Sequence, residues 1–385
     1  MTSPLLSRLF FSLMLVCGMI ATDLYGQNSL EADGQASAPV EQVALAPRPH
    51  PETLVPDDDP RWDLMGEFAG DIVLDGESAR FGLQLRPAGE LNFEGQLYRG
   101  GLPGEKDFDK DGTQVVGLHS GKFVVISGGP AVIIARPDSC LVVDEDGNQI
   151  GVLERKLRVS PTLGAKPPRN AIVLFDGTNT DQFANGKITH DGLLAQGATV
   201  SPMAQDFNLH VEFLIPYQPD KEGQKRGNSG CYLHGRYEVQ ILDSFGLAPV
   251  VNGCGSLYQT RPPRFNMSFP PLRWQTYDIV FTAPRWLAGG EKRRNAHITV
   301  WHNGVKVHDD LELKANTGAG MVEEPRLLPT RFQSHGAPVR YRNLWMVDRG
   351  LEMGGEFPRY PDADQEVSTD PPQGIESPPP ALESE

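Results

Sequence analysis

The chain of 385 residues lacks the motifs by which several common classes of protein are recognised. It has no cysteine and histidine spacing of the kind that binds zinc. It also has no glycine-rich phosphate loop, no Gly-x-Ser-x-Gly nucleophile turn and no catalytic cysteine signature. These absences leave zinc modules, phosphate-loop proteins and the common serine and cysteine hydrolases without support.

Positive charge is scarce as well. The chain carries 35 basic and 50 acidic side chains, which gives a formal net charge of −15 at pH 7. Binding to nucleic acid requires clustered positive charge. We therefore expect no nucleic-acid partner.

A long apolar run occurs only near the N-terminus. Arg8 is the only charged residue before an apolar stretch from Leu9 to Ala21. The stretch is too short to span a bilayer comfortably, and its flanks are typical of a secretory signal peptide. We predict that residues 1–26 direct export to the periplasm, the cell surface or the medium. An uncleaved anchor and a lipid-modified Cys17 are the alternatives, and no later segment is apolar enough to span a membrane.

Two further segments lack the apolar periodicity of folded structure. Residues 27–60 are rich in alanine, proline, glutamine and aspartate, which predicts a disordered linker. Residues 349–385 are acidic and proline-rich, and such a segment buries too little apolar surface to fold alone. We expect a solvated, disordered tail there.

Cysteine is also rare, with four residues in the chain. Cys140, Cys231 and Cys254 remain after removal of the signal segment. In an oxidising compartment Cys231 and Cys254 could form a disulfide. Three buried thiols are the alternative, and the sequence does not decide between them.

The remaining sequence predicts two β-rich units. Residues 61–165 contain short apolar segments separated by glycine and aspartate, which indicates a small all-β domain without a recognisable functional motif. Residues 169–348 contain eight or more expected strands, and Asn303–Gly304 lies between two of them as a strong hairpin signal. An all-β fold class follows, in which the second unit is a jelly-roll β-sandwich.

The densest set of chemically active side chains lies within residues 227–243. We interpret residues 230–242 as one strand in which apolar and polar residues alternate between two faces. The polar face then presents Tyr232, His234, Arg236, Glu238 and Gln240. Such a set suits binding of a polyhydroxylated ligand and movement of its protons. Asp243 would join it only through a local twist, and a solvated strand with a structural Arg–Glu pair is the alternative.

Three other segments carry candidate residues, each with a structural alternative. Residues 333–345 bring His335 and Arg342 near a turn, or merely brace a hairpin. Trp274 stands where a loop enters a strand, and could stack on a sugar ring or cap the core. The glycines of residues 252–258 allow either close approach of a ligand or a tight turn.

The second unit contains a series of short motifs in a definite order and spacing: Leu-Phe-Asp-Gly at 174–177, the strand at 206–213, Gly-Asn-Ser-Gly at 227–230, Tyr-Glu-Val-Gln-Ile-Leu-Asp-Ser at 237–244, Gly-Ser-Leu-Tyr at 255–258, Trp-Gln-Thr-Tyr-Asp at 274–278, Asn-Gly at 303–304 and the segment 333–345. Through these motifs it resembles the 3-keto-disaccharide hydrolase family, also described as 3-keto-glucoside 1,2-lyase/hydratase domains. Each motif is weak alone. The resemblance implies a concanavalin-like jelly roll that acts on carbohydrate.

The resemblance also implies an elimination reaction on a glucoside oxidised at C3. Removal of the C2 proton and loss of the C1 substituent require a base, an acid and a group that stabilises the enolate. The candidate base is Glu238 or Asp243, and the candidate acid is His234 or His335. Arg236, Arg342 or a bound divalent metal would stabilise the enolate. The remaining substrate-binding candidates are Tyr232, Gln240, Asn228, Tyr258 and Trp274.

Two functions without catalysis compete with this one. A β-sandwich can serve as a lectin-like module that holds a saccharide, and the fold alone does not distinguish a binder from an enzyme. A structural cell-surface protein is the third interpretation. The density of acid and base groups on one predicted strand favours an enzyme.

Overall fold

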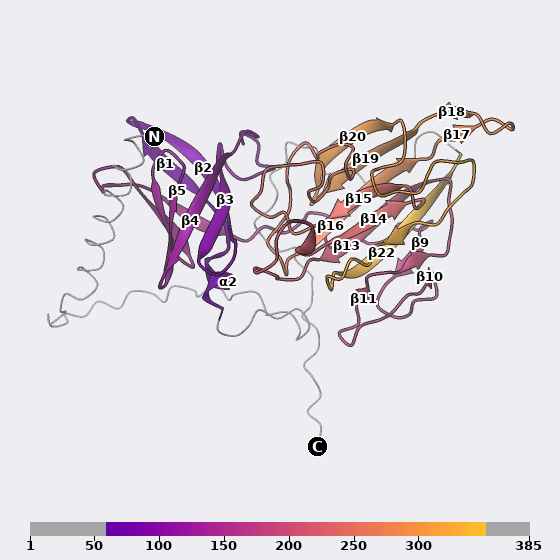
Figure 1. Cartoon of the computed structure of the whole chain (residues 1–385), viewed down its shortest axis with the longest axis horizontal. Coiled ribbons are helices and arrows are strands. Elements are labelled where there is room, and N and C mark those ends of the chain that lie inside the picture. Colours follow the sequence, from indigo (N-terminus) through magenta and orange to yellow (C-terminus); the bar gives the residue numbers. More distant parts are fainter. Residues whose placement is uncertain (1–58, 352–385) are drawn as a thin grey trace, which may run out of the picture.

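The computed structural model describes residues 59–351. The predicted signal peptide, nearly all of the predicted linker and the tail from residue 352 lie outside the described residues. Within the described residues, no helix is both long enough and apolar enough to cross a membrane. The regular secondary structure of the described residues is almost entirely β-strand, which confirms the predicted fold class (Figure 1).

The first unit is a closed barrel of eight antiparallel strands, preceded by the short helix α2 (Pro60–Leu64). Its strands are β1 (Gly66–Leu74), β2 (Glu77–Pro87), β3 (Asn92–Arg99), β4 (Thr113–Ser120), β5 (Phe123–Ser127), β6 (Val132–Ala135), β7 (Ser139–Val143) and β8 (Gln149–Lys156). Each strand pairs with the next, and β1 pairs with β8 to close the sheet. Closure leaves no free sheet edge and encloses an apolar core that includes Phe68, Leu83 and Val124.

The second unit is a sandwich of two antiparallel sheets (Figure 1). The five-stranded sheet has the order β10 (Phe183–Ala184), β12 (Thr199–Val200), β21 (Arg331–Phe332), β14 (Ser229–Leu233), β15 (Tyr237–Ile241). The seven-stranded sheet has the order β11 (Leu194–Ala195), β22 (Arg340–Gly350), β13 (Asp206–Leu214), β16 (Trp274–Thr282), β19 (Ala296–His302), β20 (Val305–Leu313), with β9 (Ile172–Phe175) also paired to β22. A short ribbon of β17 (Arg285–Trp286) and β18 (Lys292–Arg294) and the 3-10 turn η2 (Gly223–Lys225) complete the unit.

The core of the sandwich is formed by alternate residues of the two sheets. Val239 and Ile241 of β15 face Val211, Ile279 and other apolar side chains of the seven-stranded sheet. The residues between them on each strand therefore point to the outer faces. The predicted hairpin at Asn303–Gly304 is confirmed, because it joins β19 to β20 and both residues have positive φ, 50° and 79°.

The predicted single strand at residues 230–242 is wrong. The chain forms two antiparallel strands, β14 and β15, joined by a tight turn through His234 and Gly235. These residues have φ of 49° and 61°, and a type I′ hairpin turn requires positive φ at both of its central positions. His234 and Arg236 therefore lie in or beside the turn, while Tyr232 and Glu238 become directly paired neighbours on adjacent strands.

Barrel and sandwich contact each other through a small apolar cluster. Met65, at the end of α2, packs with Tyr217, Phe245 and Leu272 of the sandwich, and Trp62 lies against them. The three cysteines among the described residues are buried free thiols. Of the two alternatives for Cys231 and Cys254, the structure thus contains the unbridged one.

Candidate functional site

The outer face of the five-stranded sheet gathers polar side chains from three strands and the adjoining segments. Tyr232 of β14 is paired with Glu238 of β15 on one side and with Arg331 of β21 on the other. Gln240 follows Glu238 on the same face, and Gln333 follows Arg331. We call the residues Tyr232, Glu238, Gln240, Arg331 and Gln333 the polar face.

Glu238 is the central acidic group of the polar face. Its side chain is buried, with 2% of the residue exposed. Burial raises the pKa of Glu238 to about 7, against the lowering effects of a hydrogen bond from Tyr232 and the charge of Arg331. One of its carboxylate oxygens, Oε2, has no hydrogen-bond partner within the described chain. The side chain is thus divided near neutral pH between an acid form and a base form.

The Glu238 carboxylate lies close to the backbone of Gly230. A Cβ atom at Gly230 would lie 2.2 Å from Oε1 of Glu238 and 3.1 Å from the ring of Tyr232. Glycine at this position therefore gives the carboxylate its space over β14.

Tyr232 connects Glu238 to the neighbouring strand. Nε2 of Gln333 donates a hydrogen bond of 3.2 Å to the Tyr232 hydroxyl, and the Arg331 guanidinium lies 4.2 Å above the ring centre. Burial and the nearby Glu238 raise the pKa of Tyr232, so that its hydroxyl keeps its proton. Tyr258 is half-buried beside this group, and its backbone N–H donates to the Glu238 carbonyl at 3.2 Å.

Amide side chains extend the polar face beyond Glu238. Nε2 of Gln240 donates to Oε1 of Gln224 at 3.0 Å, and the Asn228 amide donates to the Gln224 carbonyl at 2.7 Å. Buried polar atoms in native proteins are nearly always hydrogen-bonded. Within residues 59–351, however, Asn228 Oδ1, Gln333 Oε1 and Arg331 Nε have no partner, like Glu238 Oε2. These atoms leave hydrogen-bonding capacity on this face for a polar ligand.

Two candidates from the interrupted strand do not join this group. The His234 ring packs edge-on against Phe281 at 5.0 Å, and its Nε2 is hydrogen-bonded to the Ala204 carbonyl at 2.8 Å. Burial lowers the pKa of His234, which keeps the ring neutral. The Arg236 guanidinium donates to the carbonyls of Val322 and Arg326 and holds that loop.

Asp243 is part of the contact between barrel and sandwich. Its Oδ2 accepts a hydrogen bond of 2.6 Å from Nε of Arg226, and its Oδ1 lies 3.6 Å from Arg86 of the barrel. Arg226 in turn donates to the Pro87 carbonyl of the barrel. The local twist that would bring Asp243 to the polar face is therefore absent, and its carboxylate is held between two buried arginines.

His335 lies exposed in the loop after β21. Its backbone N–H donates to Gln196 Oε1 at 3.4 Å. The loop begins at Gln333 of the polar face, so His335 lies two residues from it along the chain.

Trp274 and Arg342 lie on the opposite side of the sandwich. The Arg342 guanidinium stacks 4.0 Å above the Trp274 ring, and its Nε donates to Glu212 at 2.7 Å. All three residues are on the outer face of the seven-stranded sheet. The structure thus separates these two candidates from Glu238 by the whole sandwich core.

A buried ionic network on that opposite face was not predicted from the sequence. Nδ1 of His210 is 2.6 Å from Asp278, its Nε2 is 3.6 Å from Glu212, and its ring stacks on Trp345. Burial lowers the pKa of His210, but the charge and hydrogen bond of Asp278, aided by Glu212, outweigh it and raise the pKa to about 9. Thr162, in the segment that follows the barrel, donates to Asp278 at 2.7 Å.

Residues 170–347 match the model of the 3-keto-alpha-glucoside-1,2-lyase-like domain family. The chain belongs to this family. The resemblance found in the sequence is thereby confirmed, and the sandwich is a carbohydrate-active domain. Among solved structures, a candidate glycosyl hydrolase of Parabacteroides distasonis is 32% identical, over 47% of this chain and 84% of that one, with a TM-score of 0.44.

Two further candidate glycosyl hydrolases of Parabacteroides distasonis are more distant. One is 17% identical over 46% of this chain and 94% of its own, with a TM-score of 0.33. The other is 20% identical over 47% of this chain and 99% of its own, with a TM-score of 0.32. No curated protein matches the chain.

The lyase-like domain shows no ready-made metal site in its described part. No group of three or more histidine, cysteine, aspartate or glutamate side chains within residues 59–351 could hold a metal ion. On the polar face, the charge of Arg331 acts on Glu238 and lowers its pKa against the effect of burial.

Arg331 and Gln333 of the polar face, and Gln224 beside it, were missing from the sequence-based candidates. Gln333 belongs to a segment that the family resemblance had already marked. Arg331 and Gln224 carry no local signal, because their position depends on which strand β21 pairs with and on how the turn at η2 folds.

Proposed function

We propose that the lyase-like domain cleaves 3-keto-glucosides by elimination across C1 and C2, followed by hydration, on the polar face of the five-stranded sheet. The observation that carries the proposal is Glu238, a buried carboxyl group with a pKa near 7 and an unpartnered oxygen. A general base is most effective when its pKa lies near the working pH.

The ketone at C3 makes the C2 proton acidic, because the resulting negative charge is delocalised onto the ketone oxygen. Glu238 takes this proton, and Arg331 and the Gln333 amide stabilise the enolate oxygen. The enolate then expels the C1 substituent. Tyr232 protonates the leaving oxygen and recovers a proton from Glu238 through their hydrogen bond. Exposed His335 is the alternative proton donor.

Hydration reverses these steps with water in place of the leaving group. Tyr232 returns its proton to Glu238 and takes one from water as the water oxygen adds to C1, and Glu238 then delivers its proton to C2. The net change is replacement of the C1 substituent by a hydroxyl group. Gln224, Gln240, Asn228 and Tyr258 supply hydrogen bonds to the sugar hydroxyls.

Release of the aglycone from a chromogenic 3-keto-glucoside tests the proposal. We expect turnover by the full chain and a loss of about a hundredfold or more in kcat for Glu238→Gln. The matched control is Glu291→Gln, which changes an exposed glutamate of the sandwich. Equal turnover by the two variants would remove Glu238 from the reaction, and a parallel assay with chelator measures any contribution from a bound metal.

A lectin-like function is the second candidate. It is favoured by the amides of Gln224, Asn228, Gln240 and Gln333, because neutral amides bind sugar hydroxyls without chemistry. Saturable binding of a 3-keto-glucoside with no aglycone release would select it over the enzyme.

We also propose that the protein is exported, from the signal-like residues 1–26. Mass spectrometry of the protein from cell fractions provides the test. A shortened N-terminus in the extracytoplasmic fraction is the expected result, and a full-length cytoplasmic form would contradict it.

A further inference from the structure

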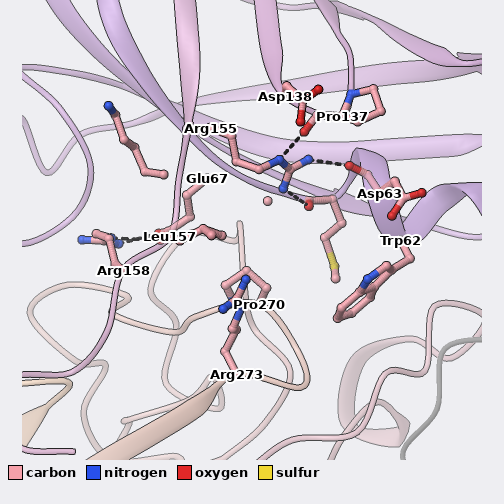
Figure 2. Close-up of a pocket in the computed structure, with 13 residues that line it drawn as sticks. Trp62, Asp63, Glu67, Pro137, Asp138, Arg155, Leu157, Arg158, Pro270 and Arg273 are labelled. Atoms are coloured by element: carbon pink, nitrogen blue, oxygen red, sulfur yellow. Dashed lines mark hydrogen bonds and ion pairs between the residues drawn. The ribbon is translucent and has the colours of Figure 1, made fainter. Parts of the chain in front are cut away.

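A cavity of about 270 Å³ lies between barrel and sandwich, apart from the polar face (Figure 2). Trp62 of α2 and Arg155 of β8 line it from the barrel side. Arg273, directly before β16, lines it from the sandwich side. Figure 2 shows the Arg273 side chain extending toward the barrel, with Arg155 across the cavity and Trp62 to one side.

Arg155 is fixed in place without a carboxylate partner. Its guanidinium donates to the backbone carbonyls of Asp63, Met65 and Pro137, at 2.8 Å in the case of Met65. These bonds use three of the five N–H donors of a guanidinium. Gly66 gives it room, since a Cβ atom there would lie 2.2 Å from Nη1 of Arg155.

Arg273 has fewer interactions than Arg155. Its guanidinium makes no hydrogen bond or ion pair with any residue that the structure describes. Burial lowers the pKa of Arg273 and outweighs the raising effect of the Glu67 charge. Burial also lowers the pKa of Arg155; the charges of Asp138 and Asp63 oppose this, and the charge of Arg273 adds to it. The two guanidinium groups are therefore near enough to repel each other.

Three acidic residues of the lining act against this repulsion. The charge of Glu67 raises the pKa of Arg273, and the charges of Asp138 and Asp63 raise that of Arg155. Glu67 is also bound by the Arg158 guanidinium and by the Gln84 amide. The remaining acidic residues of the lining, Asp63 and Asp138, are exposed. The lining therefore carries four basic side chains against three acidic ones, although the whole chain has a net charge of −15.

We propose that the cavity binds a small ligand through a carboxylate or phosphate group placed between Arg273 and Arg155. A guanidinium presents a planar fork of donors that matches such oxyanions, and the added negative charge would cancel the repulsion between the two cations. The volume lies near the lower limit for ligand pockets, about 300 Å³, which corresponds to a single-ring compound. The Trp62 indole, held edge-on to Tyr217 at 5.2 Å, offers a flat surface for that ring.

Calorimetric titration of the full chain with glucuronate, glucose 6-phosphate, inorganic phosphate and glucose tests the proposal. We expect saturable binding of at least one of the three anions, weakened by salt, and none of neutral glucose. The glucuronate and phosphate titrations distinguish a carboxylate ligand from a phosphate one. Failure of all three anions to bind would overturn the proposal.

Two variants locate the binding. Arg273→Gln should weaken the anion about tenfold or more, because it removes a charge-assisted hydrogen bond. Arg293→Gln is the matched control, since it removes one exposed positive charge from the same unit and should leave binding unchanged. Equal affinities in both variants would place the anion elsewhere.

The melting temperature without any added anion provides an independent measurement. Arg273→Gln removes a half-buried charge that repels Arg155, so that the variant should melt at the same temperature as the parent or higher. A clear decrease would show that Arg273 already has a partner and would contradict the proposal. None of these outcomes depends on turnover of a 3-keto-glucoside.

Discussion

The two outer faces of the sandwich use the same kinds of residue in opposite ways. On the seven-stranded sheet, Glu212 accepts hydrogen bonds from Arg342, Asn343 and the backbone of Gly164, and Asp278 is bound by His210 and Thr162. On the five-stranded sheet, Glu238 is buried with one oxygen unpartnered.

The difference shows in the acidity of the two glutamates. Burial acts to raise the pKa of both. For Glu212, the hydrogen bond from His210 and the charge of Arg342 outweigh burial and lower the pKa to about 2, whereas Glu238 stays near 7. A fully paired carboxylate is a structural group, and an incompletely paired one is available for proton transfer. Residue type alone therefore does not distinguish these two glutamates, whereas their hydrogen-bond partners do.

The largest expected effect comes from neutralising the available carboxylate. Glu238→Gln should reduce aglycone release by about a hundredfold or more while leaving the protein at least as stable as the parent at pH 8. Stability is expected to hold because the substitution removes a buried charge. The kinetic assay measures the activity, and urea denaturation measures the stability. A destabilised variant would show that Glu238 is a structural group like Glu212 and would contradict the account.

A substitution on the outer face of the seven-stranded sheet should instead reduce stability and leave activity unchanged. Asp278→Asn leaves His210 without its main charge partner, and loss of one member of a buried ion pair costs about 3–5 kcal/mol. The free energy of unfolding should therefore fall, while kcat of the folded protein stays near that of the parent. Loss of turnover without loss of stability would move the reaction to the seven-stranded sheet.

The pH dependence of stability should separate the two faces. Glu238 has a folded pKa raised to about 7, so stability is highest when it is protonated and falls as the pH rises from about 4.5 through 7. His210 has a folded pKa raised to about 9, so its contribution is complete below about 6.5 and is lost as the pH rises through 9. In urea titrations, Glu238→Gln should remove the fall in the free energy of unfolding between about pH 4.5 and 7. Asp278→Asn should remove the fall between about pH 6.5 and 9. If either variant leaves its own interval unchanged, that assignment is wrong.

The smallest effect is expected from the glycine beneath Glu238. Gly230→Ala places a methyl group where the carboxylate lies, so that Glu238 must move and kcat should fall about tenfold. Gly289→Ala, where no atom lies within 4 Å of the added carbon, is the control and should behave as the parent. Unchanged kcat in both variants would show that the carboxylate position is not critical.

Much of the fold could be predicted from local sequence. The strand at Ala296–His302 and the hairpin after it follow from apolar alternation and an Asn-Gly turn. Closure of the barrel could not be predicted, because it depends on pairing between β1 and β8, which are distant in sequence.

Part of the candidate site was predicted from the sequence, but the prediction assumed a single strand at residues 230–242, which is wrong. Tyr232, Glu238 and Gln240 share a face although the predicted single strand is interrupted. The turn at His234 and Gly235 makes Tyr232 and Glu238 cross-strand partners, which keeps them on one side. The sequence did not indicate this turn, because histidine is not the usual residue at its first central position, where φ is positive. Arg331 reaches the face only through tertiary pairing, which local pattern cannot show.

The central claim is that a carboxylate on the five-stranded sheet removes the C2 proton of a 3-keto-glucoside. Turnover in deuterated water, followed by NMR of the freshly formed product, tests it directly. Elimination and rehydration predict deuterium at C2 of the product formed by the parent, and both incorporation and turnover should be lost in Glu238→Gln. A product that forms with its C2 proton retained would contradict the account.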